Sequence, residues 1–300
     1  MSAIRFLTAA AVAASICLVS TSVAARTVIQ NKGSDTLVNV AQAWAEEYRN
    51  VDAEVAVAVS GGGSGTGIAA MINGTVDIAN ASRKMKSKEL KRAKESGQNP
   101  MEHVVGYDAL AVFLHKDNPI NTMSIAQLAK IFGRGGGAEK WSDLGVSVPG
   151  CGSDKIVVVS RQNNSGTYAY FQKAVLKTAA KAGVISKGKY RMGTLDMHGS
   201  KDVVDLVEKT PCAIGYSGLA YATDHIKMAC IETKEGNACV SPSVATASDR
   251  SYPIARPLLM YTNGEPKGAV KGYMDWILSD VGQCILLNKG YAPMRDVSCK

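Results

Sequence analysis

Three short segments place glycine beside serine or threonine where a β-rich run gives way to a helical pattern. They are Gly33-Ser34-Asp35-Thr36, Ser64-Gly65-Thr66-Gly67 and Ser165-Gly166-Thr167. A helix that begins at such a segment presents unpaired backbone N–H groups and the positive end of its dipole, which together stabilise an anion. Each segment alone is also typical of an ordinary N-cap. Because the design occurs three times, we predict a shared anion-binding site.

Two arginines and one aspartate lie near these segments. Arg83 follows a short predicted strand, and Arg161 precedes Ser165 by four residues. A guanidinium group can donate two parallel hydrogen bonds to an oxyanion, so we expect both arginines to supply charge, with surface ion pairs as the alternative. Asp35 is a candidate acceptor for the proton of a protonated oxyanion, or an N-cap carboxylate.

Motifs of catalysis and of nucleotide binding are incomplete in this sequence. Gly65 to Ala70 match a loose dinucleotide fingerprint, but the acidic residue expected ~20 positions later would fall at Ser82 or Arg83. The chain has no Gly-Lys-Ser/Thr and no Gly-x-Ser-x-Gly segment, and its histidines are scattered. We therefore expect a binding protein rather than an enzyme, without cofactor or metal site.

Predicted strands and helices, which must position these residues, alternate along the first part of the chain. Thr27 to Gln30, Glu54 to Ser60 and Val76 to Ala79 predict strands. Apolar residues at helical spacing predict a helix over 36–48, and a second helix follows the glycine cluster 61–67. This order is typical of a parallel sheet with helices on its faces.

A second alternating set follows Pro100. Val104 to Leu114 form a largely apolar strand that is too long for one small sheet, so we expect it to pass from one lobe into another. The further predicted elements are helices over 125–132, 167–182 and 270–278, and strands over 156–160, 213–216 and 254–261. We predict two α/β lobes joined by crossing strands.

The first 25 residues are typical of a cleaved signal peptide. Arg5 precedes an apolar run, 7–19, that is too short to span a bilayer, and small residues follow up to Ala24 and Ala25. Removal of Arg5 lowers the formal net charge from +8 to +7. We expect a soluble, periplasmic mature chain, in which the basic run 83–94 is a solvated helix face.

Cysteine usage indicates disulfide bonds. Of the seven cysteines, Cys17 lies in the predicted signal peptide. The remaining six are Cys151, Cys212, Cys230, Cys239, Cys284 and Cys299. An even count in an exported chain favours disulfides over metal ligands, with buried free thiols as the alternative. Cys230 with Cys239 and Cys284 with Cys299 are local pairings that leave Cys151 for Cys212, but six cysteines allow 15 connectivities.

The ordered motifs resemble a known family. Gly33 to Leu37, Ser60 to Gly67, Ala81-Ser82-Arg83 and Arg161 to Thr167 stand in the order found in the phosphate-binding periplasmic proteins of ABC-type phosphate uptake systems. The resemblance implies a two-lobe class II periplasmic-binding-protein fold, in which each lobe is a mostly parallel sheet flanked by helices. The lobes would comprise residues 26–106 with 253–300, and residues 107–252.

The resemblance also implies the ligand, its binding residues and its partner. Phosphate would be enclosed by hinge closure, and the closed protein would dock on the permease subunits of the transporter. The implied phosphate-binding residues are Ser34, Thr36, Leu37, Ser64, Gly65, Thr66, Ser82, Arg83, Arg161, Ser165, Gly166 and Thr167. Well-known members carry an aspartate at the position of Arg83, which accepts the proton of hydrogen phosphate. Asp35 is the candidate replacement.

Other functions remain open from the sequence. The site would also suit sulfate, molybdate or tungstate if it lacked a proton acceptor. A secreted phosphoester hydrolase would need a nucleophile with a nearby base, and an extracellular adhesion protein could use the same fold. We expect a monomer that does not bind nucleic acid.

Overall fold

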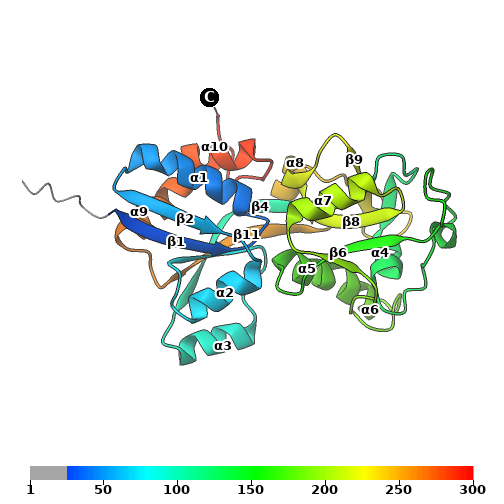
Figure 1. Cartoon of the computed structure of the whole chain (residues 1–300), viewed down its shortest axis with the longest axis horizontal. Helices are drawn as coiled ribbons and strands as arrows, with labels where there is room; N and C mark the ends of the chain where they lie inside the picture. Colours follow the sequence, from blue (N-terminus) through cyan, green and yellow to red (C-terminus); the bar gives the residue numbers. More distant parts are fainter. Residues whose placement is uncertain (1–25, 300) are drawn as a thin grey trace, which may run out of the picture.

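The computed structural model describes residues 26–299, which form two lobes lying side by side along the long axis of the molecule (Figure 1). The predicted signal peptide, residues 1–25, lies outside the described residues. Among the helices formed by residues 26–299, none is both long enough and apolar enough to cross a membrane.

The first lobe is built on three parallel strands. β1 (Thr27–Gly33) lies between β2 (Val55–Ser60) and β3 (Ile78–Ala81) and pairs with both in parallel. Parallel strands need crossover connections, which are α1 (Val38–Val51) and α2 (Ser64–Ile72). The two helices cover opposite faces of the sheet (Figure 1).

Three further helices complete this lobe. α3 (Ser87–Glu95) packs beside α2, whereas α9 (Gly268–Ile277) and α10 (Asp280–Asn288) pack beside α1. The indole N–H of Trp44 in α1 donates to the backbone oxygen of Gly282 in α10 at 2.7 Å. The C-terminal helices therefore return to the lobe in which the described chain begins.

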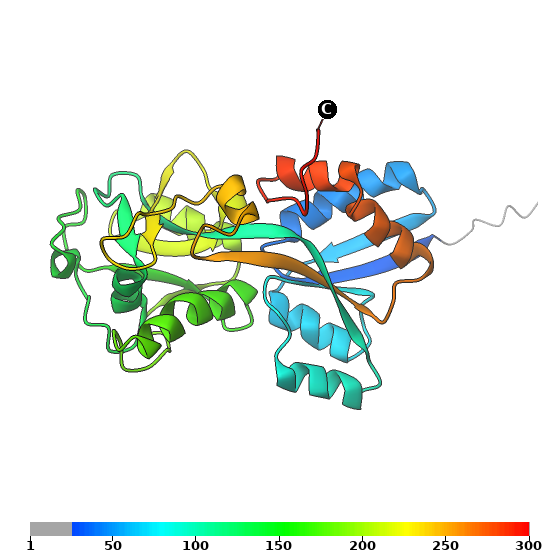
Figure 2. The ribbon, with the colours of Figure 1, turned by 180° about the vertical axis from the view of Figure 1, so that it is seen from behind.

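Two long antiparallel strands connect the lobes. β4 (Pro100–His115) and β11 (Ala255–Asn263) pair from Pro100 opposite Asn263 to Ala109 opposite Ala255. Both run from one lobe into the other (Figure 2). β11 also pairs with β3, so one curved sheet of nine strands continues through both lobes. The long predicted strand at 104–114 corresponds to most of β4.

The second lobe repeats the parallel arrangement. β6 (Val157–Arg161) lies between β7 (Leu195–Met197) and β8 (Ala213–Gly218) and is parallel to both. β8 and the short strand β9 (Ile226–Met228) pair with the far half of β4. A separate small sheet joins β5 (Thr122–Ser124) to β10 (Cys230–Glu232).

The helices of this lobe cover both faces of its sheet. They are α4 (Ile125–Phe132), α5 (Gly166–Phe171), α6 (Thr178–Lys181), α7 (Ser200–Lys209) and α8 (Val244–Ser248), with short 3-10 turns at Trp141–Leu144 and Leu219–Tyr221. The helix predicted over 167–182 contains a π-helical segment, Gln172–Lys177, that joins α5 to α6. The phenyl ring of Phe171 stacks on Tyr216 of β8, which fixes this helical run against the sheet.

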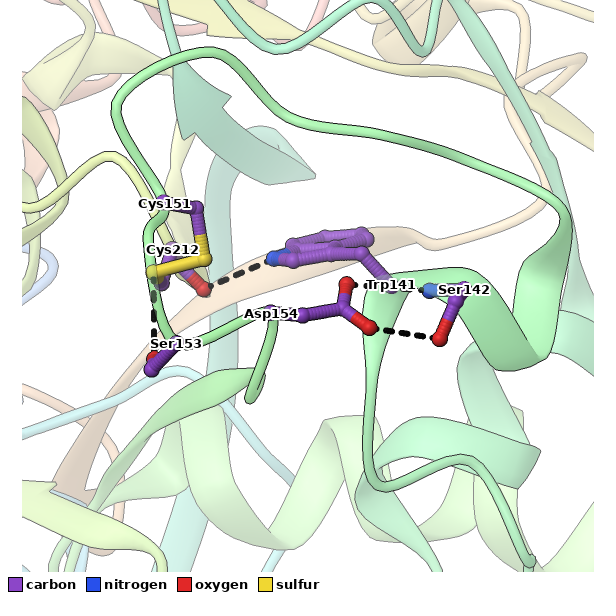
Figure 3. The surroundings of a disulfide bond; sticks show 6 residues. All are labelled: Trp141, Ser142, Cys151, Ser153, Asp154 and Cys212. Carbon is purple, nitrogen blue, oxygen red and sulfur yellow. Dashed lines mark hydrogen bonds between the residues drawn. A yellow bond between two sulfur atoms is a disulfide. The ribbon is translucent and has the colours of Figure 1, made fainter.

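Six cysteines of the described residues form three disulfides. Cys151 is joined to Cys212, Cys230 to Cys239 and Cys284 to Cys299, with Cα–Cα distances of 4.9, 5.5 and 5.5 Å. Figure 3 shows the first of these beside the buried indole of Trp141, whose Nε1 donates to the Cys212 backbone oxygen at 3.1 Å. This disulfide fastens the loop before β6 to the loop before β8.

Candidate functional site

The three predicted helix N-termini meet between the lobes. α1 and α2 contribute from the first lobe and α5 from the second, and the hydroxyl groups at their starts are buried. Ser34 Oγ donates to Ser82 Oγ at 3.0 Å, and Ser64 Oγ lies 3.3 Å from Ser82 Oγ. Thr36 Oγ1 lies 3.0 Å from Thr167 Oγ1 of the other lobe. We call the contact between the two lobes the seam. The five side chains form one hydroxyl cluster there.

The backbone of the second lobe closes directly over this cluster. A Cβ atom at Gly166 would overlap Ser64 Oγ and lie 2.5 Å from Ser82 Oγ, so only glycine fits there. Gly65 N–H donates to the backbone oxygen of Asn164 at 2.8 Å. Ser165 caps α5 with its own hydroxyl, which accepts from the backbone N–H of Thr167 at 3.1 Å. The lobes are therefore in contact at this site.

Arg161 lies at the end of β6 and points into the seam. Its side chain is 1% exposed, and its Nη2 donates to Asp35 Oδ2 at 2.9 Å across the lobes. Nη1 donates to Ser200 Oγ at 2.9 Å, at the start of α7. Burial lowers the pKa of Arg161, while the charge of Asp35 opposes this change. Asp35 Oδ1 also accepts from Gly62 N–H at 2.8 Å, so this carboxylate orients both partners.

A second buried ion pair lies on the crossing strands, and sequence reasoning did not identify it. Arg256 of β11 donates from Nε and Nη2 to Asp108 Oδ2 of β4, at 3.0 and 2.8 Å. Both side chains are 0% exposed. Burial raises the pKa of Asp108, although Arg256 acts in the opposite direction. The available signal was that each of the two predicted strands, 104–114 and 254–261, contains a single charged residue among mostly apolar ones.

Arg256 reaches the hydroxyl cluster directly. Its Nη2 lies 3.1 Å from Thr36 Oγ1 and 3.2 Å from Thr167 Oγ1, and Nη1 donates to the Ser82 backbone oxygen at 3.4 Å. The antiparallel register that places Arg256 opposite Asp108 also carries both side chains to the seam. A guanidinium group thus contacts threonines of both lobes.

Arg83 lines a cavity together with Ser82, but its guanidinium bonds to a carboxylate and not to the hydroxyl cluster. Its Nη1 and Nη2 donate to the two carboxylate oxygens of Glu89 in α3, at 2.8 and 2.9 Å. Burial raises the pKa of Glu89, but these bonds and the Lys86 N–H bond outweigh it, so the pKa lies below its usual value. An acidic partner six residues away in sequence therefore holds Arg83 at the first turn of α3.

Two other predicted residues contribute backbone or packing rather than side-chain polar groups. Leu37 is 0% exposed and belongs to the core beneath α1. Thr66 Oγ1 donates to the Gly62 backbone oxygen at 2.6 Å, which stabilises the first turn of α2 instead of facing the hydroxyl cluster. Both residues lie in the predicted turns, but neither side chain bonds to the hydroxyl cluster.

Two tyrosines hold the turn before α1 in place. Tyr221 OH donates to the Asp35 backbone oxygen at 2.6 Å, and Tyr291 OH donates to the Thr36 backbone oxygen. Burial raises the pKa of Tyr221 to about 12, so it stays protonated and can donate. Since Tyr221 follows β8, this bond also links the two lobes.

Buried hydroxyl, N–H and guanidinium donors converge where two α/β lobes meet around a pair of crossing strands. Such convergence is the chemistry that recognises an oxyanion, and no activated nucleophile is needed for it. The fold and the site together define the class of two-lobed binding proteins.

Comparison with known proteins narrows this class. A model of the PBP superfamily domain matches residues 19–281. The chain is 34% identical over 278 residues to the phosphate-binding protein PstS of Pseudomonas aeruginosa, covering 89% of this chain and 83% of that protein. It is 31% identical over 298 residues to protein SphX of Synechococcus elongatus, covering 95% and 83%.

A solved structure agrees with these relatives. A phosphate ABC transporter substrate-binding protein from Clostridium perfringens, solved with bound phosphate, superposes with a TM-score of 0.75 at 27% identity, covering 90% of this chain and 100% of that one. The chain belongs to the PBP superfamily and, within it, to the family of the periplasmic phosphate-binding proteins.

Proposed function

We propose that this protein captures inorganic phosphate between its lobes and delivers it to an ABC-type membrane transporter. The observation that carries the proposal is the buried hydroxyl cluster, which three helix N-termini and the guanidinium of Arg256 surround. Relatives named for phosphate binding, and a neighbour with bound phosphate, support the choice of ligand. The protein would act by binding alone, without catalysis.

The proposed ligands are the groups that meet at the seam. Hydroxyls that bond to one another, such as Thr36 and Thr167, would turn to phosphate oxygens. The proposed phosphate ligands are Ser34, Thr36, Ser64, Gly65, Ser82, Arg161, Ser165, Gly166 and Thr167, with Arg256 added and Arg83 removed. A micromolar site needs ~8 kcal/mol, and charge-assisted hydrogen bonds contribute roughly 1.5–3 kcal/mol each. This set of donors is sufficient.

We propose that Asp35 accepts the proton of hydrogen phosphate. Its side chain is 12% exposed, lies between Ser34 and Thr36, and bonds to Arg161 at 2.9 Å across the lobes. Asp108 is the less suitable acceptor, because it is fully enclosed and its Oδ2 already accepts two bonds from Arg256. Sulfate has no proton to donate, so Asp35 would meet only lone pairs and exclude it.

The proposed transport cycle uses the two lobes as rigid bodies. Residues 26–106 with 253–300 would form one lobe and 107–252 the other, with β4 and β11 as the hinge. The protein would work as a monomer in the periplasm, after removal of residues 1–25, and its closed form would dock on the permease subunits.

Calorimetric titration of the purified protein, stripped of bound anion, tests the function. We expect one-to-one phosphate binding and no heat with sulfate. In Asp35→Asn, the ratio of phosphate affinity to sulfate affinity should fall by at least tenfold. Equal binding of phosphate and sulfate by the unmodified protein would overturn the ligand assignment. Absence of binding with phosphate, sulfate and molybdate would overturn the site itself.

A further inference from the structure

The hydroxyl cluster together with Arg161 and Arg256, which we call the inner site, contains little net charge of its own. Arg161 is neutralised by Asp35 at 2.9 Å and Arg256 by Asp108 at 2.8 Å. Hydroxyl groups and helix N-termini act only over short distances, because the field of a helix end falls off within one turn. Attraction of an anion from solution must therefore come from charges outside the inner site.

A basic groove lies between the lobes and leads outward from the inner site. A cavity of about 540 Å³ includes Ser82 of the hydroxyl cluster in its wall. Lys84 and Lys86 line it from the first lobe, and Lys173 and Lys177 line it from the second. We call this cavity the entrance groove. Its position places exposed ammonium groups of both lobes on the way to Ser82.

The positive charge continues beyond the entrance groove. A neighbouring cavity of about 670 Å³ shares Lys86 with it and adds Arg134, Lys189 and Arg191. Among the residues that line the two cavities, Asp196 is the single carboxylate. The groove therefore forms a basic surface that spans the seam.

Three of these lysines form no ion pair among the described residues. Within residues 26–299, no carboxylate lies within 4.0 Å of Lys86, Lys173 or Lys177, whereas Lys84 lies 2.9 Å from Glu102. Burial lowers the pKa of Lys86, and the charge of Arg83 lowers it further, whereas Glu89 opposes this change. Lys177 of the other lobe adds a smaller lowering effect. Like charges thus face each other across the entrance groove.

We propose that Lys86, Lys173 and Lys177 form an anion-capture site at the entrance, separate from the inner site, which attracts phosphate from solution and passes it to Ser82 and the hydroxyl cluster. This inference rests on the proposed function and adds the step that precedes binding. Fields of this kind raise association rates by roughly 10- to 1,000-fold and weaken as salt is added. An anion between Lys86 and Lys177 also offsets their repulsion, which favours closure of the lobes.

The test measures the rate of phosphate association by stopped flow. A fluorophore on Thr223→Cys reports closure, because Thr223 is exposed and follows Tyr221, which bonds across the seam. The variant Lys86→Gln/Lys173→Gln/Lys177→Gln should bind phosphate about tenfold more slowly at low salt, with a dissociation rate unchanged within about twofold. The difference should vanish at 1 M salt, where the Debye length is ~3 Å.

A matched variant controls for net charge. Lys116→Gln/Lys234→Gln/Lys267→Gln removes the same charge from exposed positions that line neither cavity, and it should associate within about twofold of the unmodified protein. Equal slowing of both triple variants, or of neither, would overturn the capture site while phosphate binding stands. No phosphate binding by the unmodified protein at equilibrium would instead remove the proposed function, and the capture role with it.

Discussion

At the scale of single residues, Arg256 and Asp108 form the most fully enclosed ion pair among the described residues. Both side chains are fully enclosed, so each charge depends on the other for compensation. Asp108 also accepts from the Leu219 N–H at 3.2 Å, and Arg256 bonds to Thr36 and Thr167. The pair therefore connects the crossing strands to both walls of the site.

Removing one partner should leave an uncompensated charge inside the molecule. We expect Arg256→Met to lower the free energy of unfolding by about 3–5 kcal/mol, as measured by denaturant titration. The double variant Arg256→Met/Asp108→Leu serves as the control and should recover most of this loss, yet bind phosphate poorly. If the single variant were as stable as the unmodified protein, the pair would not have the role assigned to it.

At the scale of elements, the site depends on how closely the first turns of α2 and α5 approach each other. Ser64 opens α2 and Gly166 opens α5, and the missing Cβ of Gly166 allows their backbones to meet. β6 sets this approach, because Arg161 ends the strand and Ser165 caps the helix only four residues later.

A methyl group at Gly166 should prevent this approach without unfolding the second lobe. We expect Gly166→Ala to weaken phosphate affinity by at least tenfold in calorimetric titration, because Ser64 and Ser82 can no longer reach the closed arrangement. Gly152→Ala is the matched control, since its Cβ would have no neighbour within 4 Å. Unchanged affinity of Gly166→Ala would show that the lobes close differently.

At the scale of the whole molecule, the covalent links lie within lobes rather than across the seam. Cys151–Cys212 and Cys230–Cys239 fasten the second lobe, and Cys284–Cys299 fastens the chain after α10. The lobes are connected by β4 and β11 and by side-chain bonds such as that of Arg161 with Asp35. Hinge motion is thus compatible with all three disulfides.

Removing a disulfide should therefore change stability and leave binding intact. The chain-entropy model assigns roughly 4 kcal/mol to Cys151–Cys212, which are 61 residues apart, and roughly 2.5 kcal/mol to Cys230–Cys239, which are 9 apart. We expect each serine double variant to lose stability in that order and to keep its phosphate affinity within about twofold. An affinity loss for the Cys151–Cys212 variant would contradict the separation of these roles.

The sequence by itself determined the features that depend on local order along the chain. The glycine-hydroxyl segments, the alternation of strands and helices and the length of β4 are all visible as spacing, so the two-lobe α/β fold and the meeting of the three glycine-hydroxyl segments could be predicted. Arg161 was expected from its place four residues before Ser165, and it bonds to Asp35 between the lobes; its role as a phosphate ligand stays a prediction.

The tertiary structure alone decided which charges meet. Arg83 was expected at the site but lies against Glu89, while Arg256 reaches Thr36 from a strand 220 residues away in sequence. Pairing of this kind depends on strand register and on helix packing over long separations, and a pattern of residue types does not contain that information. The closed contact at Gly166 and the basic groove between Lys86 and Lys177 arise in the same way, because each joins two lobes that fold from different parts of the chain.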